Sequence, residues 1–109
     1  MNKIVRWSSL LAVAALGFAA TAAQAQDAKE LAKSHACFTC HAMAGTKVGP
    51  GFAEIAAKFA GKPNAAQTLA AAMEHGENGT FGAMPMPAQA GLTDSDAKLI
   101  ADWILSQKK

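Results

Sequence analysis

The stretch Cys37-Phe38-Thr39-Cys40-His41 places two thiols three residues apart and an imidazole directly after the second thiol. This C-x-x-C-H spacing is the attachment signature of a c-type haem. Two thiols at this distance can each add to one of the two vinyl groups on a haem edge, and the next residue then brings its imidazole under the iron. The pentapeptide therefore predicts one covalently bound haem on Cys37 and Cys40, with its iron ligated by His41.

Three other kinds of site also use paired cysteines. A thioredoxin-like redox pair needs a βαβ pattern around the motif, and the sequence shows none. A structural zinc site needs four ligands, and only His35 and His75 remain to join the motif, at spacings unlike those of a zinc finger. A disulfide that closes so short a loop adds little stability, because the entropic gain grows with loop size. Haem attachment is the favoured interpretation.

The first 25 residues differ in composition from the rest of the chain. Their basic start contains Lys3 and Arg6, an apolar stretch covers residues 10–20, and small residues follow at Ala23-Gln24-Ala25. This order is typical of a secretory signal peptide with an A-x-A cleavage site. The apolar run is shorter than the roughly 20 residues of a membrane span, which disfavours an anchor. We expect residues 1–25 to be cleaved off during export.

The remaining residues, 26–109, are enough for a single domain. So short a chain buries a small core and tends to need additional stabilisation from a disulfide, a metal or a large apolar cofactor. Without Lys3 and Arg6, eight basic residues are balanced by eight acidic ones. The net charge of +2 thus belongs to the targeting segment and does not indicate a nucleic-acid partner. We also expect no membrane span after cleavage.

A second candidate ligand segment lies far downstream, at Phe81-Gly82-Ala83-Met84-Pro85-Met86-Pro87. A haem iron held by one histidine keeps an open face, whereas a thioether on the other side closes the site for electron transfer and raises the potential. The prolines fix the backbone and remove amide donors, so the segment can present a side chain stiffly. Either methionine of this segment could supply the thioether.

Residues 26–109 resemble, over nearly their full length, the short bacterial class I cytochromes c of the cytochrome c-551 type. The resemblance is carried by Cys37-Phe38-Thr39-Cys40-His41, Val48-Gly49-Pro50, Ala56-Ala57-Lys58-Phe59-Ala60-Gly61, Pro85-Met86-Pro87 and Trp103-Ile104-Leu105-Ser106-Gln107-Lys108. It implies an all-α fold of about four helices wrapped around one covalently attached haem c. It also implies Met86 as the second axial iron ligand and the Pro50 carbonyl as the acceptor of a hydrogen bond from the free ring nitrogen of His41.

The same resemblance implies a periplasmic, monomeric one-electron carrier rather than an enzyme. Its redox partners would belong to respiration or denitrification, for example the bc1 complex as donor and a haem-containing nitrite reductase or a terminal oxidase as acceptor. We expect Lys33, Lys47, Lys58 and Lys62, with neighbouring apolar residues, to form a weak docking face. The alternative is a five-coordinate haem protein that binds gases or turns over peroxide, which would follow if Met86 did not bind iron.

Two residues depart from the family pattern. Phe81 stands where relatives carry a tryptophan whose indole nitrogen bonds a haem propionate, and a phenyl ring cannot donate that bond. Gln89 falls where relatives have an asparagine beside the methionine sulfur. We expect both changes to alter the reduction potential.

The hydrophobic periodicity predicts helices and no strands. We expect a helix from Asp27 into the haem motif, a short one after Gly51, a third between Asn64 and Gly76, and a fourth after Thr93. Asn64 and Thr93 are the predicted N-caps of the last two.

The fourth helix should bury an apolar stripe that contains Leu99, Ile100, Trp103 and Ile104. The segment 76–91, rich in Gly, Pro and Ala, should be a functional loop that carries the methionine.

Overall fold

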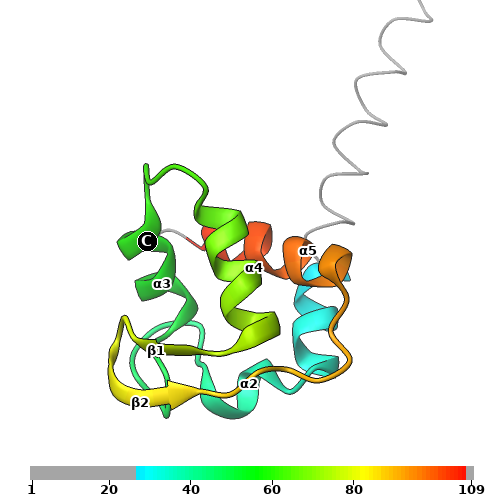
Figure 1. Ribbon diagram of the computed structural model, residues 1–109. Helices are drawn as coiled ribbons and strands as arrows, with labels where there is room; N and C mark the ends of the chain where they lie inside the picture. The colour runs from blue at the N-terminus through cyan, green and yellow to red at the C-terminus, as the bar shows by residue number, and fades with distance from the viewer. Residues whose placement is uncertain (1–26, 108–109) are drawn as a thin grey trace, which may run out of the picture.

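The computed structural model describes residues 27–107, which form a helical protein with one small hairpin. In chain order the elements are a helix over residues 27–34, α2 (Cys37–Cys40), α3 (Phe52–Phe59), α4 (Ala65–His75), β1 (Glu77–Gly79), β2 (Gly82–Met86) and α5 (Asp94–Leu105) (Figure 1). α5 packs against both α3 and α4. The last three predicted helices are present, but the first, expected to run from Asp27 into the haem motif, is interrupted at residues 35–36, where Ala36 has a left-handed φ of 59°, and the chain becomes helical again at α2. The predicted signal peptide, residues 1–25, lies outside the described residues.

The core is built largely from small side chains. Six of the thirteen buried apolar residues within the described part of the chain are alanines. The largest packing partners are aromatic: the Trp103 ring lies edge-on to Phe52 at 5.0 Å between centroids, and 6.1 Å from Phe38. Trp103 is thus a core residue, as expected. A protein core with so few large side chains needs another apolar body to complete it.

The predicted start of α5 is confirmed. The Thr93 hydroxyl oxygen accepts a hydrogen bond from the Asp96 amide at 3.2 Å, as a helix N-cap does. Ala97, Ile100, Ala101, Trp103 and Ile104 form the buried stripe.

The prediction that Leu99 belongs to this stripe was wrong, since Leu99 is 47% exposed. Successive residues are about 100° apart around a helix, so the neighbour of a fully buried Ile100 can point to solvent.

α4 begins and ends close to the predicted residues, but its predicted N-cap does not form. Asn64 has a φ of 58°, and its side chain makes no capping hydrogen bond. A capping side chain requires extended backbone at the N-cap, which this left-handed conformation excludes. At the other end Gly76 terminates the helix, and its amide donates to the Ala72 carbonyl at 2.9 Å.

The expectation of helices without strands is corrected by the hairpin inside segment 76–91. β1 and β2 pair antiparallel, with Glu77 opposite Met86 and Gly79 opposite Gly82. The sequence carries no strand signal here, because Gly, Pro and Asn are poor strand formers and most of the hairpin is exposed, which removes the alternating pattern.

Side-chain contacts hold the tip of the hairpin. The Glu77 carboxylate accepts hydrogen bonds from the amide and the hydroxyl of Thr80. The Lys58 ammonium of α3 donates to the Thr80 carbonyl at 3.1 Å, which ties the hairpin to a helix 22 residues earlier in the chain.

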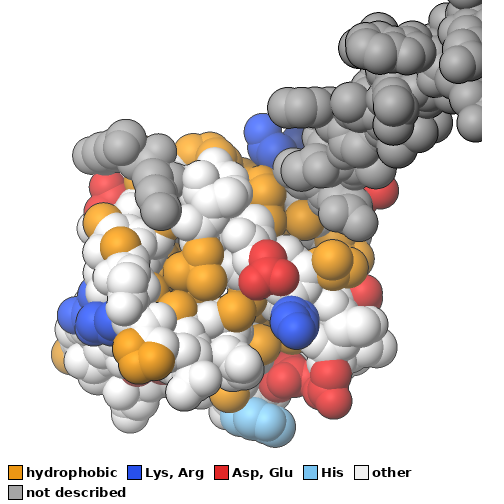
Figure 2. Space-filling model, turned by 90° about the horizontal axis from the view of Figure 1, so that it is seen from above, with side chains coloured by type: hydrophobic (Ala, Val, Ile, Leu, Met, Phe, Trp, Pro, Cys, Tyr) orange, Lys and Arg blue, Asp and Glu red, His pale blue; other side chains and the backbone are white. Residues whose placement is uncertain are grey.

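The described residues contain no candidate membrane span, and charges of both signs are mixed on the face seen in Figure 2. Within residues 27–107 no helix is long and apolar enough to cross a bilayer. On the face seen in Figure 2, lysines and acidic residues are interspersed. This mixture agrees with the charge balance of residues 26–109.

Candidate functional site

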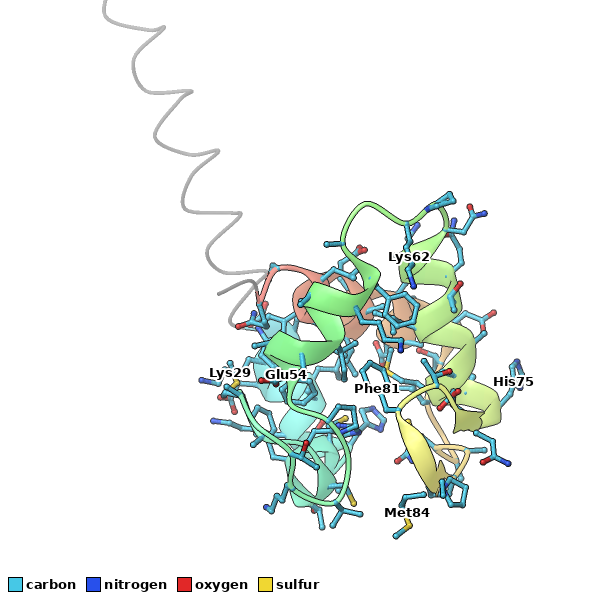
Figure 3. All side chains as sticks on the ribbon, turned by 90° about the vertical axis from the view of Figure 1, so that its left-hand side faces the viewer. Lys29, Glu54, Lys62, His75, Phe81 and Met84 are labelled. Carbon is cyan, nitrogen blue, oxygen red and sulfur yellow. The ribbon has the colours of Figure 1, made fainter. Side chains whose placement is uncertain are left out.

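An apolar cavity of about 720 Å³ lies between the α2 end of the molecule and the hairpin. Its wall is formed by residues of α3, α4 and α5, of α2 and the loop that follows α2, and of the hairpin. The side of the molecule that carries α3 and the hairpin faces the viewer in Figure 3, with Phe81 between the two. The residues singled out in the sequence that line this cavity are Cys37, Cys40, His41, Pro50, Phe81, Met84, Met86 and Gln89.

The two cysteines occupy the first and last positions of the single helical turn α2. Residues three apart lie on the same helix face, so both side chains reach the cavity from one side. Both thiols are free and partly buried. Burial raises the pKa of the Cys37 thiol above its ordinary value, and a backbone hydrogen bond offsets this in part. Cys37 is therefore held as a neutral thiol.

His41 ends α2 and turns its ring into the cavity. Its backbone is extended, with φ −117° and ψ 130°, while its amide still bonds the Cys37 carbonyl. The ring nitrogen Nδ1 lies 2.7 Å from the Pro50 carbonyl oxygen. Since a carbonyl can only accept, Nδ1 carries the proton, and Nε2 keeps its lone pair for a ligand. The Phe52 ring stacks on the imidazole at 5.5 Å, with 29° between the planes.

The loop between His41 and α3 is fastened at both ends, and this fixes the Pro50 carbonyl. The Cys40 carbonyl accepts from the Gly49 amide at 2.8 Å, and the Ala42 carbonyl accepts from the Phe52 amide at 2.9 Å. The second bond satisfies one of the free amides at the start of α3, which has no side-chain cap.

Gly49 lies directly against the His41 ring. A Cβ at this position would lie 2.7 Å from Cε1 and 3.1 Å from Nδ1 of His41. From the sequence, Gly49 was noted only as part of the stretch Val48-Gly49-Pro50 that carries the family resemblance. The Gly-Pro-Gly sequence was the available signal, but it does not show which side chain occupies the space beside the glycine.

We expect Gly49→Ala to push the imidazole away from Pro50 and to destabilise the protein by about 1–3 kcal/mol, the usual range for overpacking. The free energy of unfolding in denaturant measures the stability change, and the NMR shift of the His41 Nδ1 proton reports the hydrogen bond. Gly61→Ala is the control, because it strains a positive φ of 72° but meets nothing within 4 Å. An unchanged Nδ1 proton shift in Gly49→Ala would contradict the assigned contact.

The two methionines of the hairpin lie in different surroundings. Met86 is partly buried, packs against the core and lines the cavity that contains His41. Met84 reaches only the edge of the cavity and is 69% exposed. In Figure 3 its side chain points away from the body of the protein. The geometry therefore offers the Met86 thioether, rather than that of Met84, to a group bound inside.

Of the other residues singled out in the sequence, Phe81 and His75 lie closer to the protein surface than His41 and Met86. The Gln89 side-chain amide donates to the Pro87 carbonyl at 2.8 Å. Phe81 is 40% exposed, and the Lys58 ammonium lies 5.0 Å from its ring centroid. His75 is exposed and points outward at the end of α4 in Figure 3.

The four predicted docking lysines do not form one cluster of contacts. Lys47 donates to the Phe38 carbonyl at 3.1 Å, and Lys58 is bound to the hairpin. Lys33 pairs with Glu30 at 3.3 Å, and Lys62 lies 5.4 Å from the Phe59 ring. Lys47 and Lys58 are the pair with exposed apolar neighbours at the cavity edge, Val48 and Phe81.

The chemistry of this donor set fits a c-type haem. The free thiols of Cys37 and Cys40 share one helix face. The His41 Nδ1 bonds the Pro50 carbonyl, which leaves Nε2 available. The Met86 thioether lines the same apolar cavity. These are the attachment and ligand groups of a cytochrome c haem.

Comparison with known proteins agrees with this chemistry. The sequence model of the family "Cytochrome c" matches residues 25–108. Cytochrome c-552 of Nitrosomonas europaea is 41% identical over 102 residues, which cover 94% of this chain and 96% of that protein. Cytochrome c-551 of Pseudomonas aeruginosa is 42% identical over 100 residues, which cover 92% and 93%.

The fold is also shared with a solved structure. The crystal structure of wild-type Nitrosomonas europaea cytochrome c552 matches with a TM-score of 0.71 and 44% identity, over 73% of this chain and 99% of that chain. The chain therefore belongs to the cytochrome c family, with the class I fold, and is a monohaem electron carrier with one covalently bound haem c.

Proposed function

We propose that Cys37 and Cys40 bind the haem through thioethers and that His41 Nε2 and Met86 Sδ are its two axial iron ligands. Each thiol would supply both the sulfur and the hydrogen that add across one vinyl group of the haem. The observation that carries the proposal is that all four side chains line one apolar cavity. The haem supplies a one-electron iron couple.

The protein side chains would tune the potential of this couple, and no bond is made or broken when the electron is transferred. The hydrogen bond from His41 Nδ1 to the Pro50 carbonyl fixes the ring orientation and increases the donor strength of Nε2. A thioether ligand and apolar walls both favour the less charged ferrous state, so they raise the potential. Closure of both axial positions leaves no place for a substrate, which is what electron transfer requires.

The test is an absorption spectrum of the haem-loaded protein, oxidised and reduced, before and after carbon monoxide. We expect a low-spin haem that stays with the polypeptide after denaturation and whose reduced spectrum does not respond to the gas. A reduced spectrum that shifts with carbon monoxide would rule out stable Met86 ligation. The five-coordinate gas-binding or peroxidase-like function would then be the better description.

We further propose that the protein is made with a signal peptide, residues 1–25, and acts as a monomer in the bacterial periplasm. The composition of the first 25 residues and the bacterial origin of the relatives support this. Its partners would be respiratory or denitrification proteins, such as the bc1 complex and a nitrite reductase or terminal oxidase. Mass spectrometry of the exported protein tests the cleavage site, with a new N-terminus at Gln26 expected.

The docking face that we propose surrounds the cavity edge next to the hairpin. Val48, Phe81 and Met84 are exposed apolar residues that line this edge, and Lys47 and Lys58 flank them. A small apolar patch with two lysines beside it suits transient binding to an acidic partner, since the charges steer the encounter.

Charge reversal at Lys58 tests this face. We expect Lys58→Glu to slow oxidation by anionic ferricyanide at low ionic strength, with the difference disappearing in high salt, because salt screens exposed charges. Lys58→Gln is the matched control, since it also disrupts the bond to Thr80 but adds no negative charge. Lys33→Glu should have a smaller effect, because Lys33 is already paired with Glu30. Equal rates and equal salt dependence in wild type and Lys58→Glu would exclude the proposed face.

A further inference from the structure

The C-terminal turn of α4 is in direct contact with the backbone of the segment that carries Met86. Gly76 ends the helix with φ 86° and ψ 167°, a conformation essentially restricted to glycine. The space beside its Cα is filled by that segment. A Cβ on Gly76 would lie 2.9 Å from the Met86 carbonyl oxygen and 3.2 Å from the Ala88 amide nitrogen. These neighbours are backbone atoms, so they cannot rotate away as a side chain would.

A hydrogen bond from the same turn of α4 holds the segment on the far side of Met86. The Gln89 amide donates to the Met73 carbonyl at 2.9 Å. Met73 is one of the last residues of the helix, whose carbonyls have no partner within it. Its side chain is buried in the core at 5% exposure, which anchors this end of α4. The segment between the hairpin and Gln89 is thus seated on a fixed part of the molecule.

The prolines on both sides of Met86 couple the position of its sulfur to the contacts that Gly76 and Met73 make with the segment. Pro85 and Pro87 fix the φ angles on both sides of Met86, which leaves the segment fewer ways to absorb a shift locally. Figure 1 shows the end of α4 beside the paired strands, where β1 leaves the helix and β2 returns toward it. A change of a few tenths of an ångström at Gly76 therefore reaches the Met86 side chain.

We propose that Gly76 is a positioning residue for the Met86 thioether, and that the α4 turn formed by Met73 and Gly76 is the seat that holds this ligand in place. The inference rests on the proposed ligation of iron by Met86. Gly76 acts through the backbone of Met86 and touches no haem atom itself. Any side chain at position 76 lifts the segment and weakens the sixth bond, so that external ligands compete for the iron.

The test compares Gly76→Ala with Gly91→Ala in the haem-loaded protein. Both substitutions strain a positive φ, 86° and 81°, but a Cβ on Gly91 meets nothing within 4 Å. We expect imidazole to bind ferric Gly76→Ala about tenfold more tightly than wild type, equivalent to a sixth bond weakened by about 1.4 kcal/mol. The ferric sulfur-to-iron charge-transfer absorption should weaken in parallel. Gly91→Ala should match wild type in both measurements.

Equal imidazole affinity in Gly76→Ala and Gly91→Ala would overturn the role of Gly76. If Met86 does not ligate the iron at all, the result is distinguishable, because the wild-type protein itself would then lack the charge-transfer absorption. If Gly76→Ala does not fold, the hydrogen-exchange rate of the Gln89 amide in the wild-type protein tests the proposal instead. The Gln89 amide should be protected, and imidazole should increase its exchange selectively. Exchange of Gln89 at the rate of a free amide would exclude the seat.

Discussion

Met86→Ala is expected to convert the protein from an inert electron carrier into one whose reduced haem binds carbon monoxide. On the proposed ligation, loss of the Met86 thioether leaves His41 as the one axial ligand and opens the opposite side of the iron. The reduction potential should fall by a sizeable part of the roughly 0.8 V range over which axial ligands set haem potentials. Spectroscopic titration with carbon monoxide and potentiometry measure the two effects.

Met84→Ala is the matched control, because Met84 lies two residues away in the same strand and is 69% exposed. We expect it to keep the wild-type spectrum and to remain indifferent to the gas. If Met84→Ala opened the iron and Met86→Ala did not, the two residues would have to exchange their assigned roles.

The double variant Cys37→Ala/Cys40→Ala is expected to lose covalent haem and most of its folding stability. The cavity proposed to hold the haem measures about 720 Å³. An enclosed core cavity costs about 24 cal/mol per Å³, so an enclosed third of this volume would cost about 6 kcal/mol. That is comparable with the whole stability of a small domain, about 5–15 kcal/mol. The alanine-rich core cannot compensate for this loss.

Mass spectrometry of the denatured protein and the helical signal in circular dichroism measure both effects. The single variants Cys37→Ala and Cys40→Ala should each keep one thioether and show intermediate stability. A double variant that melted at the wild-type temperature without haem would show that the protein core is sufficient on its own.

Several parts of the fold could be predicted because their signals are local. Thr93 caps α5 through an amide three residues away, and Phe52, Ile55 and Phe59 repeat at the helical period after Gly51. The haem motif is equally local, since it places its two thiols on one turn of helix. In each case residues within a few positions of one another determine the geometry.

The predictions that were wrong concern features that local sequence patterns do not determine. The hairpin was missed because its residues are poor strand formers and mostly exposed, and because the Lys58 contact that ties its tip to α3 spans 22 residues of chain. The Asn64 cap failed because the backbone takes a left-handed conformation there, which no local pattern indicates. Leu99 was assigned to the wrong face because the orientation of α5 depends on the helices packed against it.

The sequence by itself determined the haem-attachment motif, the helical class and the two candidate methionines, because covalent spacing and helical periodicity are written within short stretches of chain. Only the tertiary structure decided that Met86 is partly buried in the cavity wall while Met84, at the cavity edge, is 69% exposed, that Gly49 lies against the His41 ring, and that Gly76 contacts the backbone of the methionine segment. These features are contacts between segments up to tens of residues apart. They depend on how the elements pack, and no single stretch of the sequence contains that information.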